Sequence, residues 1–119
     1  MATVVKRKLS GSTDGKAIKI TQTATAGDTI HTAVSGTTDG SYDEIWLWAY
    51  NSYEADIVLT IEFGGATVPD QNIELTVPYK SGLIPVVPGL ILQNERVVKA
   101  FAGTANVITI IGFVNRITD

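Results

Sequence analysis

The sequence predicts an all-β protein: an antiparallel β-sandwich, jelly-roll-like, with about eight strands. Three observations support this fold class. Apolar residues recur at every second position in short runs, Gly, Pro, Asp and Asn separate the runs, and no helical periodicity extends beyond one turn. A small closed barrel fits the same pattern, which leaves the order of the strands open.

The chain of 119 residues is long enough for a single domain with one hydrophobic core. We expect residues 1–10 to form a short basic N-terminal arm and residues 11–119 to form a single β-sandwich domain. The chain has no cysteine, which excludes disulfides, thiolate metal ligands and cysteine nucleophiles.

Basic residues are concentrated at the start of the chain. Lys6, Arg7 and Lys8 are consecutive, whereas the chain from Leu9 onward has 6 basic and 12 acidic residues. An acidic body repels nucleic acid, so we expect no nucleic-acid partner. We also expect no membrane partner and no signal peptide, because no apolar run approaches the ~20 residues of a membrane span and none of signal-peptide length follows the N-terminus.

The central segment, residues 42–63, contains both tryptophans and the densest apolar alternation in the chain. We predict a β-hairpin here, with its tip at residues 51–54. Because side chains alternate between the two faces of a strand, the first arm has two apolar faces, one of Ile45, Leu47 and Ala49 and one of Trp46, Trp48 and Tyr50. We expect the aliphatic face to join the sandwich core with the same-face residues of the second arm, Ile57, Leu59 and Ile61.

Apolar alternation predicts further strands on both sides of this hairpin. We place them at residues 4–9, 16–23, 28–34, 72–77, 89–92, 96–102 and 107–117. The proline-containing residues 78–92 are predicted to form an edge strand, a bent strand or a loop, because proline cannot donate a ladder hydrogen bond. Gly112 interrupts the last, long apolar strand and is predicted to mark a bulge or a close contact.

The chain has one histidine, His31, and no Gly-x-Ser-x-Gly motif accompanies it. Alternation places His31 on the same strand face as Thr29 and Ala33. We interpret it as a surface or interface residue rather than as a member of a catalytic triad. A ring of His31 side chains around a symmetry axis could still bind zinc.

Paired carboxylates are the other candidates for chemistry, because two of them can act as acid and base on a glycosidic bond. Asp43 and Glu44 are adjacent on a strand and face opposite ways, whereas Glu54 and Asp56 are expected to be solvated at the hairpin tip. The remaining pair, Glu62 and Glu74, is expected on a solvated sheet face. Asp39 and Asp43 lack the spacing of a calcium loop. We therefore expect no catalytic residue, no metal site and no cofactor.

A family resemblance adds to this interpretation. Between Glu44 and Ile117 the chain contains, in order, EIWLWAYN, ADIVLTIEFGG, LTVPYKSGL, VPGLIL and AFAGTANVITIIGFVNRI. This succession resembles small virion proteins of tailed bacteriophages that decorate or cement the capsid. Such proteins are often β-rich, non-enzymatic and oligomeric, commonly trimeric. The resemblance implies a homo-oligomer that contacts the major capsid protein at the surface of the virion, after synthesis in the host cytoplasm.

The resemblance also implies which elements make the contacts. The expected assembly contacts are the basic segment and the aromatic strand face, namely Lys6, Arg7, Lys8, Trp46, Trp48 and Tyr50. The residues themselves leave three interpretations of the aromatic face open: packing in the sandwich core, a subunit interface, or a platform on which sugars stack. The alternative function is accordingly a carbohydrate- or receptor-binding β-sandwich module, such as a small tail-fibre or lectin-like domain.

Overall fold

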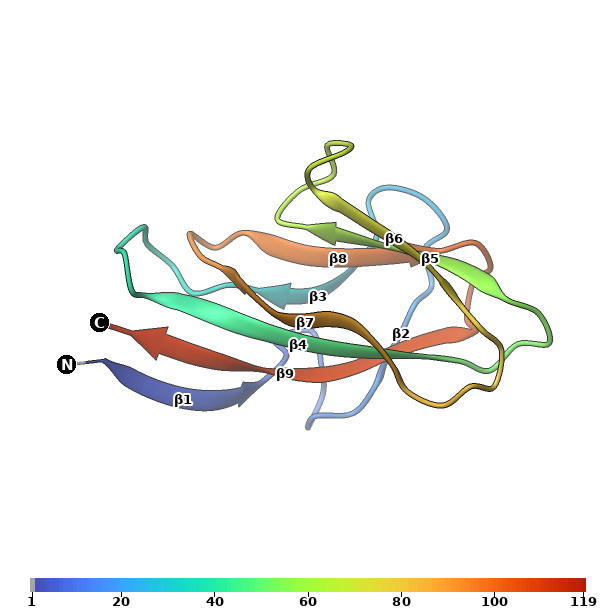
Figure 1. Ribbon diagram of the computed structural model, residues 1–119, viewed down its shortest axis with the longest axis horizontal. Coiled ribbons are helices and arrows are strands. Elements are labelled where there is room, and N and C mark those ends of the chain that lie inside the picture. The colour runs from blue at the N-terminus through green and yellow to red at the C-terminus, as the bar shows by residue number, and fades with distance from the viewer. Residues whose placement is uncertain (1) are drawn as a thin grey trace.

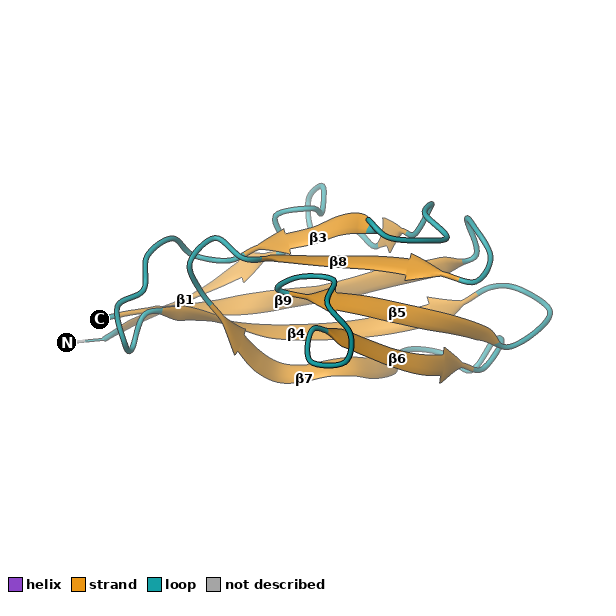
Figure 2. Cartoon of the chain, turned by 90° about the horizontal axis from the view of Figure 1, so that it is seen from above, coloured by secondary structure: helices purple, strands orange, loops and turns teal. Residues whose placement is uncertain are grey.

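A computed structural model describes residues 2–119 as a sandwich of two antiparallel sheets (Figures 1 and 2). Sheet A consists of β1 (Thr3–Lys8), β2 (Ile18–Lys19), β4 (Tyr42–Asn51), β7 (Ile84–Leu92) and β9 (Ile108–Thr118). Sheet B consists of β3 (Asp28–Thr32), β5 (Ile57–Phe63), β6 (Asn72–Val77) and β8 (Val97–Ala102). The described residues form no helix. The predicted all-β antiparallel sandwich is confirmed.

The strand order is that of a jelly roll. Sheet A has the order β1-β9-β4-β7, with the short β2 also paired to β9, and sheet B has the order β3-β8-β5-β6. Apart from β2, early strands therefore pair with late ones in a nested way: β1 with β9, β3 with β8, β4 with β7 and β5 with β6. This arrangement of eight strands in two sheets distinguishes the fold from the small closed barrel that the sequence left open.

The segment predicted to be a hairpin is instead an arch between the two sheets. Its first arm, β4, pairs with β7 and β9, whereas its second arm, β5, pairs with β6 and β8 (Figure 1). The two aliphatic faces still meet as predicted, but across the core rather than side by side: all six side chains are buried, namely Ile45, Leu47, Ala49, Ile57, Leu59 and Ile61. Alternation defines the buried face of each arm equally well in a hairpin and in an arch, so it could not distinguish them.

The structure also settles three further elements, of which only the first departs from the expectation. The strand expected at residues 16–23 is reduced to the two residues of β2. The proline-containing segment forms β7, an edge strand of sheet A whose register shifts twice along β4, and its prolines are therefore tolerated. Gly112 marks a close contact: a Cβ there would lie 2.0 Å from the carbonyl oxygen of Trp46.

The basic segment is part of the sandwich and does not extend from it as an arm. Residues 3–8 form β1, which pairs with β9 along its whole length, from Thr3 opposite Thr118 to Lys8 opposite Phe113. Leu9 follows at once and is buried in the core, 1% exposed. The expected boundary after residue 10 therefore does not correspond to a boundary in the fold.

Candidate interaction surface

The outer face of sheet A carries a cluster of three aromatic rings. Trp46 on β4 lies directly opposite Phe113 on β9, and Trp48 lies one pleat further along the same face. The ring centroids of Trp46 and Phe113 are 6.4 Å apart, those of Trp48 and Phe113 are 6.0 Å apart, and the rings are inclined by only 16° and 27°. We call this face, formed by β1, β9, β4 and β7 on the side away from sheet B, the aromatic face.

The aromatic face is not part of the core between the sheets. Trp46, Trp48 and Phe113 are each half-buried, whereas the inward residues of β4 are fully buried. Of the three interpretations of the tryptophans, packing between the two sheets is therefore wrong. An interface and a ligand platform both remain compatible with their position.

Local packing fixes Trp46 in place. The indole lies over Gly89, where a Cβ would come within 2.7 Å of Trp46 Cζ2. Its Nε1–H donates to Glu44 Oε1 at 2.7 Å, and Asn115 Nδ2 donates to the same oxygen at 3.0 Å. These two hydrogen bonds, that from Trp46 first, lower the pKa of Glu44 below its usual value.

Trp48 stacks on Trp46 and Phe113 but lacks the hydrogen bond that Trp46 makes. Its indole N–H donates to no described residue, yet it is not among the polar atoms of the described residues that are buried without a partner. The N–H therefore reaches solvent and is free to donate to a partner. Tyr50 continues the same face, opposite Thr109.

The basic triplet is divided between the two faces of β1. Lys6 and Lys8 lie on the aromatic face, because they pair with Asn115 and Phe113 of β9. The Lys6 ammonium lies 4.7 Å from the centroid of the Phe113 ring, within the range of a cation–π contact. Arg7 is on the opposite side of the strand, exposed where sheet B does not cover β1. The structure thus brings together five of the six expected contact residues and separates Arg7 from them.

Exposed aliphatic side chains extend the aromatic face at both edges. Val4 on β1, 63% exposed, pairs with Ile117, and Ile91 on β7, 54% exposed, pairs with Glu44. Cross-strand partners share a face, so both side chains belong to the outer side of sheet A. Apolar side chains therefore lie at both edges of the aromatic face, and the cross-strand row that contains Ile91 also contains Glu44, Asn115 and Lys6.

A buried polar network joins the two sheets at the other side of β4. His31 Nε2 lies 2.6 Å from Asp43 Oδ2, and Arg116 donates to Asp43 through Nε at 2.8 Å and Nη2 at 3.0 Å. The His31 Nδ1 atom accepts a hydrogen bond from the backbone N–H of Ser10 at 3.0 Å. The proton of the neutral imidazole is therefore on Nε2, where it is donated to Asp43.

The prediction that His31 is a surface or interface residue is wrong, because its side chain is only 2% exposed. The reason is a register shift between Thr29 and His31, which inserts an extra residue into β3 and turns Ile30 and His31 both inward. Strict alternation cannot anticipate a bulge. Asp43 and Glu44 do face opposite sides of β4, as expected.

Burial and hydrogen bonding shift the pKa values of His31 and Asp43 in opposite directions. Burial lowers the pKa of His31, and the hydrogen bond to Asp43 opposes this only in part. Burial would raise the pKa of Asp43, but the hydrogen bonds from Arg116 and His31 hold it below its usual value. The Asp43 carboxylate in turn raises the pKa of Arg116. Neutral histidine beside an ion pair is the stable arrangement.

The network does not form a nucleophilic triad. Ser10 contacts His31 through its backbone N–H, while its hydroxyl oxygen accepts a hydrogen bond from the Thr32 N–H at 2.7 Å. A triad requires the serine hydroxyl to donate to the imidazole. The contacts seen here connect the segment after β1 with β3, β4 and β9 and have a structural role.

Glu62 is also buried, contrary to the expected solvated sheet face. Its side chain is 2% exposed, and its two carboxylate oxygens accept hydrogen bonds from the Gly27 N–H at 2.7 Å and the Thr25 hydroxyl at 2.9 Å. The loop before β3 thus folds over the outer face of sheet B. Within the described residues, no group of three or more His, Asp or Glu side chains is arranged to hold a metal ion.

Comparison of the chain with models of protein families, with curated proteins and with solved structures found no match. In the part of the chain that the structure describes, no helix is long and apolar enough to cross a membrane.

Proposed function

We propose that this chain is a non-enzymatic structural subunit that assembles through the aromatic face of sheet A. The observation that carries the proposal is the half-exposed stack of Trp46, Trp48 and Phe113, flanked by the exposed side chains of Val4 and Ile91. Aromatic residues are enriched in the buried centres of protein interfaces, where they supply much of the binding energy.

The size of the face suits such a role. A stable interface buries about 800 Å² per partner, which is roughly one-eighth of the 6350 Å² accessible surface of this chain. A sheet face four strands wide, with apolar side chains at both edges, can supply an area of this order. Water would be excluded from the rings at its centre.

We propose further that the assembly is a homo-oligomer, a trimer, that decorates and stabilises a bacteriophage capsid by binding the major capsid protein. Two points support this: the resemblance of residues 44–117 to capsid decoration proteins, and the jelly-roll strand order, an architecture common in viral capsid proteins. Because one fold serves many functions, the fold supports the proposal only together with the aromatic face.

The oligomeric state tests the first step. Light scattering on the full chain during size exclusion is expected to give the mass of a trimer. Ile91→Lys should shift the mass to that of a monomer, because it places a charge at the edge of the aromatic face. Val58→Lys is the matched control: Val58 is also on a strand and 44% exposed, but on sheet B. A wild-type monomer, or equal effects of both substitutions, would contradict assembly through the aromatic face.

Capsid binding tests the second step. Purified protein is mixed with capsids that lack it, and the bound fraction is measured by co-sedimentation. Lys6→Glu with Lys8→Glu should weaken binding, because both cations lie beside the aromatic face and form no ion pair with a described residue. Lys80→Glu, in the exposed turn that follows β6 of sheet B, is the control. Undiminished binding by the double variant would show that Lys6 and Lys8 do not contribute to capsid binding.

A carbohydrate-binding module is the second candidate, and one observation favours it. The three rings are nearly parallel and Trp48 has a free N–H, an arrangement on which a sugar ring can stack and hydrogen-bond. This function predicts that glycans shift the tryptophan fluorescence of the wild-type chain and not that of Trp48→Leu. A glycan array without binders would eliminate it.

A further inference from the structure

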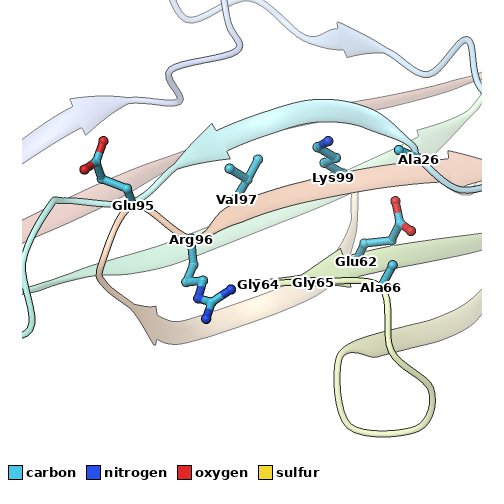
Figure 3. A pocket seen from close by; sticks show the side chains of 9 residues that line it. All are labelled: Ala26, Glu62, Gly64, Gly65, Ala66, Glu95, Arg96, Val97 and Lys99. Carbon is cyan, nitrogen blue, oxygen red and sulfur yellow. The ribbon is translucent and has the colours of Figure 1, made fainter.

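A cleft of about 270 Å³ opens on the outer face of sheet B, on the side of the molecule opposite to the aromatic face (Figure 3). It lies where Gly64 and Gly65 follow β5 and where β8 begins after Arg96. Lys99 of β8 and Glu62 of β5 form its other polar walls.

The two cations of this cleft lack partners. Neither Arg96 nor Lys99 forms an ion pair or a side-chain hydrogen bond with another described residue. Lys99 is half-buried in the middle of its strand. An anion that enters the cleft can therefore contact either cation without displacing an ion pair between described residues.

The neighbouring carboxylates do not fill that role. Glu62 is directly opposite Lys99 in the β5–β8 pairing, yet its oxygens are taken by the Gly27 N–H and the Thr25 hydroxyl. Figure 3 shows the Glu95 carboxylate directed away from the Arg96 guanidinium, which reaches toward Gly64. Glu62 therefore forms no ion pair with Lys99, and Glu95 forms none with Arg96, so both cations can pair with a ligand.

The base of the cleft is kept free of side chains. Gly64 has φ +82°, a conformation that other residues rarely adopt. A Cβ on Gly65 would lie 2.2 Å from Gln71 Oε1, an oxygen that accepts the Thr67 N–H and so closes the β5–β6 loop. The glycine pair thus lets a small molecule approach the backbone beside the Arg96 guanidinium (Figure 3).

We propose that this cleft binds a small ligand through an oxyanion, a carboxylate or a phosphate group. Arg96 offers a planar fork of N–H donors that matches such a group, and Lys99 adds a compact positive charge. The volume is slightly below that of typical drug-sized sites, which limits the ligand to the size of a small organic acid or a phosphate ester. This site is independent of the proposed assembly through sheet A.

The test is a titration of the ¹⁵N-labelled full chain by NMR, with sodium phosphate in one series and sodium acetate in another, at constant ionic strength set with sodium chloride. Saturable shifts are expected at the amides of Gly65, Val97 and Lys99. Arg96→Gln and Lys99→Met should each weaken binding about tenfold, because each removes one charge-assisted contact. The methionine retains the apolar stem of the lysine.

Lys19→Gln is the control, because it removes one positive charge from the surface outside the cleft. A response to phosphate alone, to acetate alone or to both identifies which oxyanion the cleft accepts. Shifts that chloride reproduces, or an equal loss of binding in Lys19→Gln, would overturn the proposal. Thermal unfolding and light scattering of the cleft variants should match the wild type, which separates this result from any failure of assembly.

Discussion

His31 Nε2 lies 2.6 Å from Asp43 Oδ2, and this hydrogen bond connects β3 of sheet B to β4 of sheet A. Both side chains are buried, and Arg116, on β9, donates a hydrogen bond to the same carboxylate. Apolar packing between sheets tolerates sliding, whereas directional hydrogen bonds between charged and polar groups specify one alignment. The network therefore helps to fix how the two sheets are placed on each other.

Replacing His31 should destabilise the fold. His31→Ala removes a buried ring, leaves the Ser10 N–H without a partner and takes one of three donors from Asp43 Oδ2. The expected cost is about 2–4 kcal/mol in the free energy of unfolding. Urea unfolding followed by tryptophan fluorescence measures it. Thr29→Ala, an exposed change on the same strand, should cost much less. Equal midpoints for the two variants would show that the network contributes little.

Stability should fall in mildly acidic solution. The folded-state pKa of His31 is lowered from 6.5, so the folded protein keeps the ring neutral while the unfolded chain binds a proton. The free energy of unfolding is thus constant above pH 6.5 and decreases as the pH falls below it, by at most about 1.4 kcal/mol per pH unit, until the folded-state pKa is reached.

The chain has a single histidine, so this assignment can be checked directly. His31→Gln should be less stable near neutral pH and should lose the decrease that begins at pH 6.5. A second decrease, beginning below pH 4.5, should remain, because the lowered pKa values of Glu44 and Asp28 stabilise the fold only while these carboxylates are ionised. If His31→Gln retains the first decrease, another group is responsible for it.

Asp43→Asn tests the other half of the network. The substitution leaves the Arg116 guanidinium beside a neutral amide, and breaking a buried ion pair by removing one partner costs about 3–5 kcal/mol. Denaturant unfolding measures the loss. Asp39→Asn, in the exposed loop before β4, should be nearly neutral. A loss under about 1 kcal/mol for Asp43→Asn would mean that water replaces the carboxylate as the hydrogen-bond partner of Arg116.

Gly89→Ala should disturb the aromatic face. The new Cβ would lie 2.7 Å from Trp46 Cζ2, at a residue with φ +79°. Gly82→Ala is a closely matched control, because Gly82 has the same φ but no atom within 4 Å of the Cβ position. The control should cost about 1 kcal/mol for the backbone conformation alone. Gly89→Ala should cost more and shift the tryptophan emission; identical behaviour of both variants would contradict tight packing of Trp46 on Gly89.

The sequence anticipated the faces of strands better than their partners. Alternation correctly assigned the inward residues of β4 and β5, and a close contact at Gly112 was one of the two expected outcomes. It failed at His31, where a bulge breaks the period, and at Glu62, where a distant loop covers the sheet face. Both errors come from contacts between segments far apart in the chain, which a local pattern does not contain.

The sequence by itself determined the all-β class, the core face of the central strand and the second, aromatic face behind it, because side-chain direction in a strand follows from the position of each residue alone. Only the tertiary structure decided that β4 and β5 lie in different sheets, that Trp46 and Trp48 face outward and that His31 meets Asp43. These outcomes depend on which strands pair, and pairing reflects the packing of the whole chain.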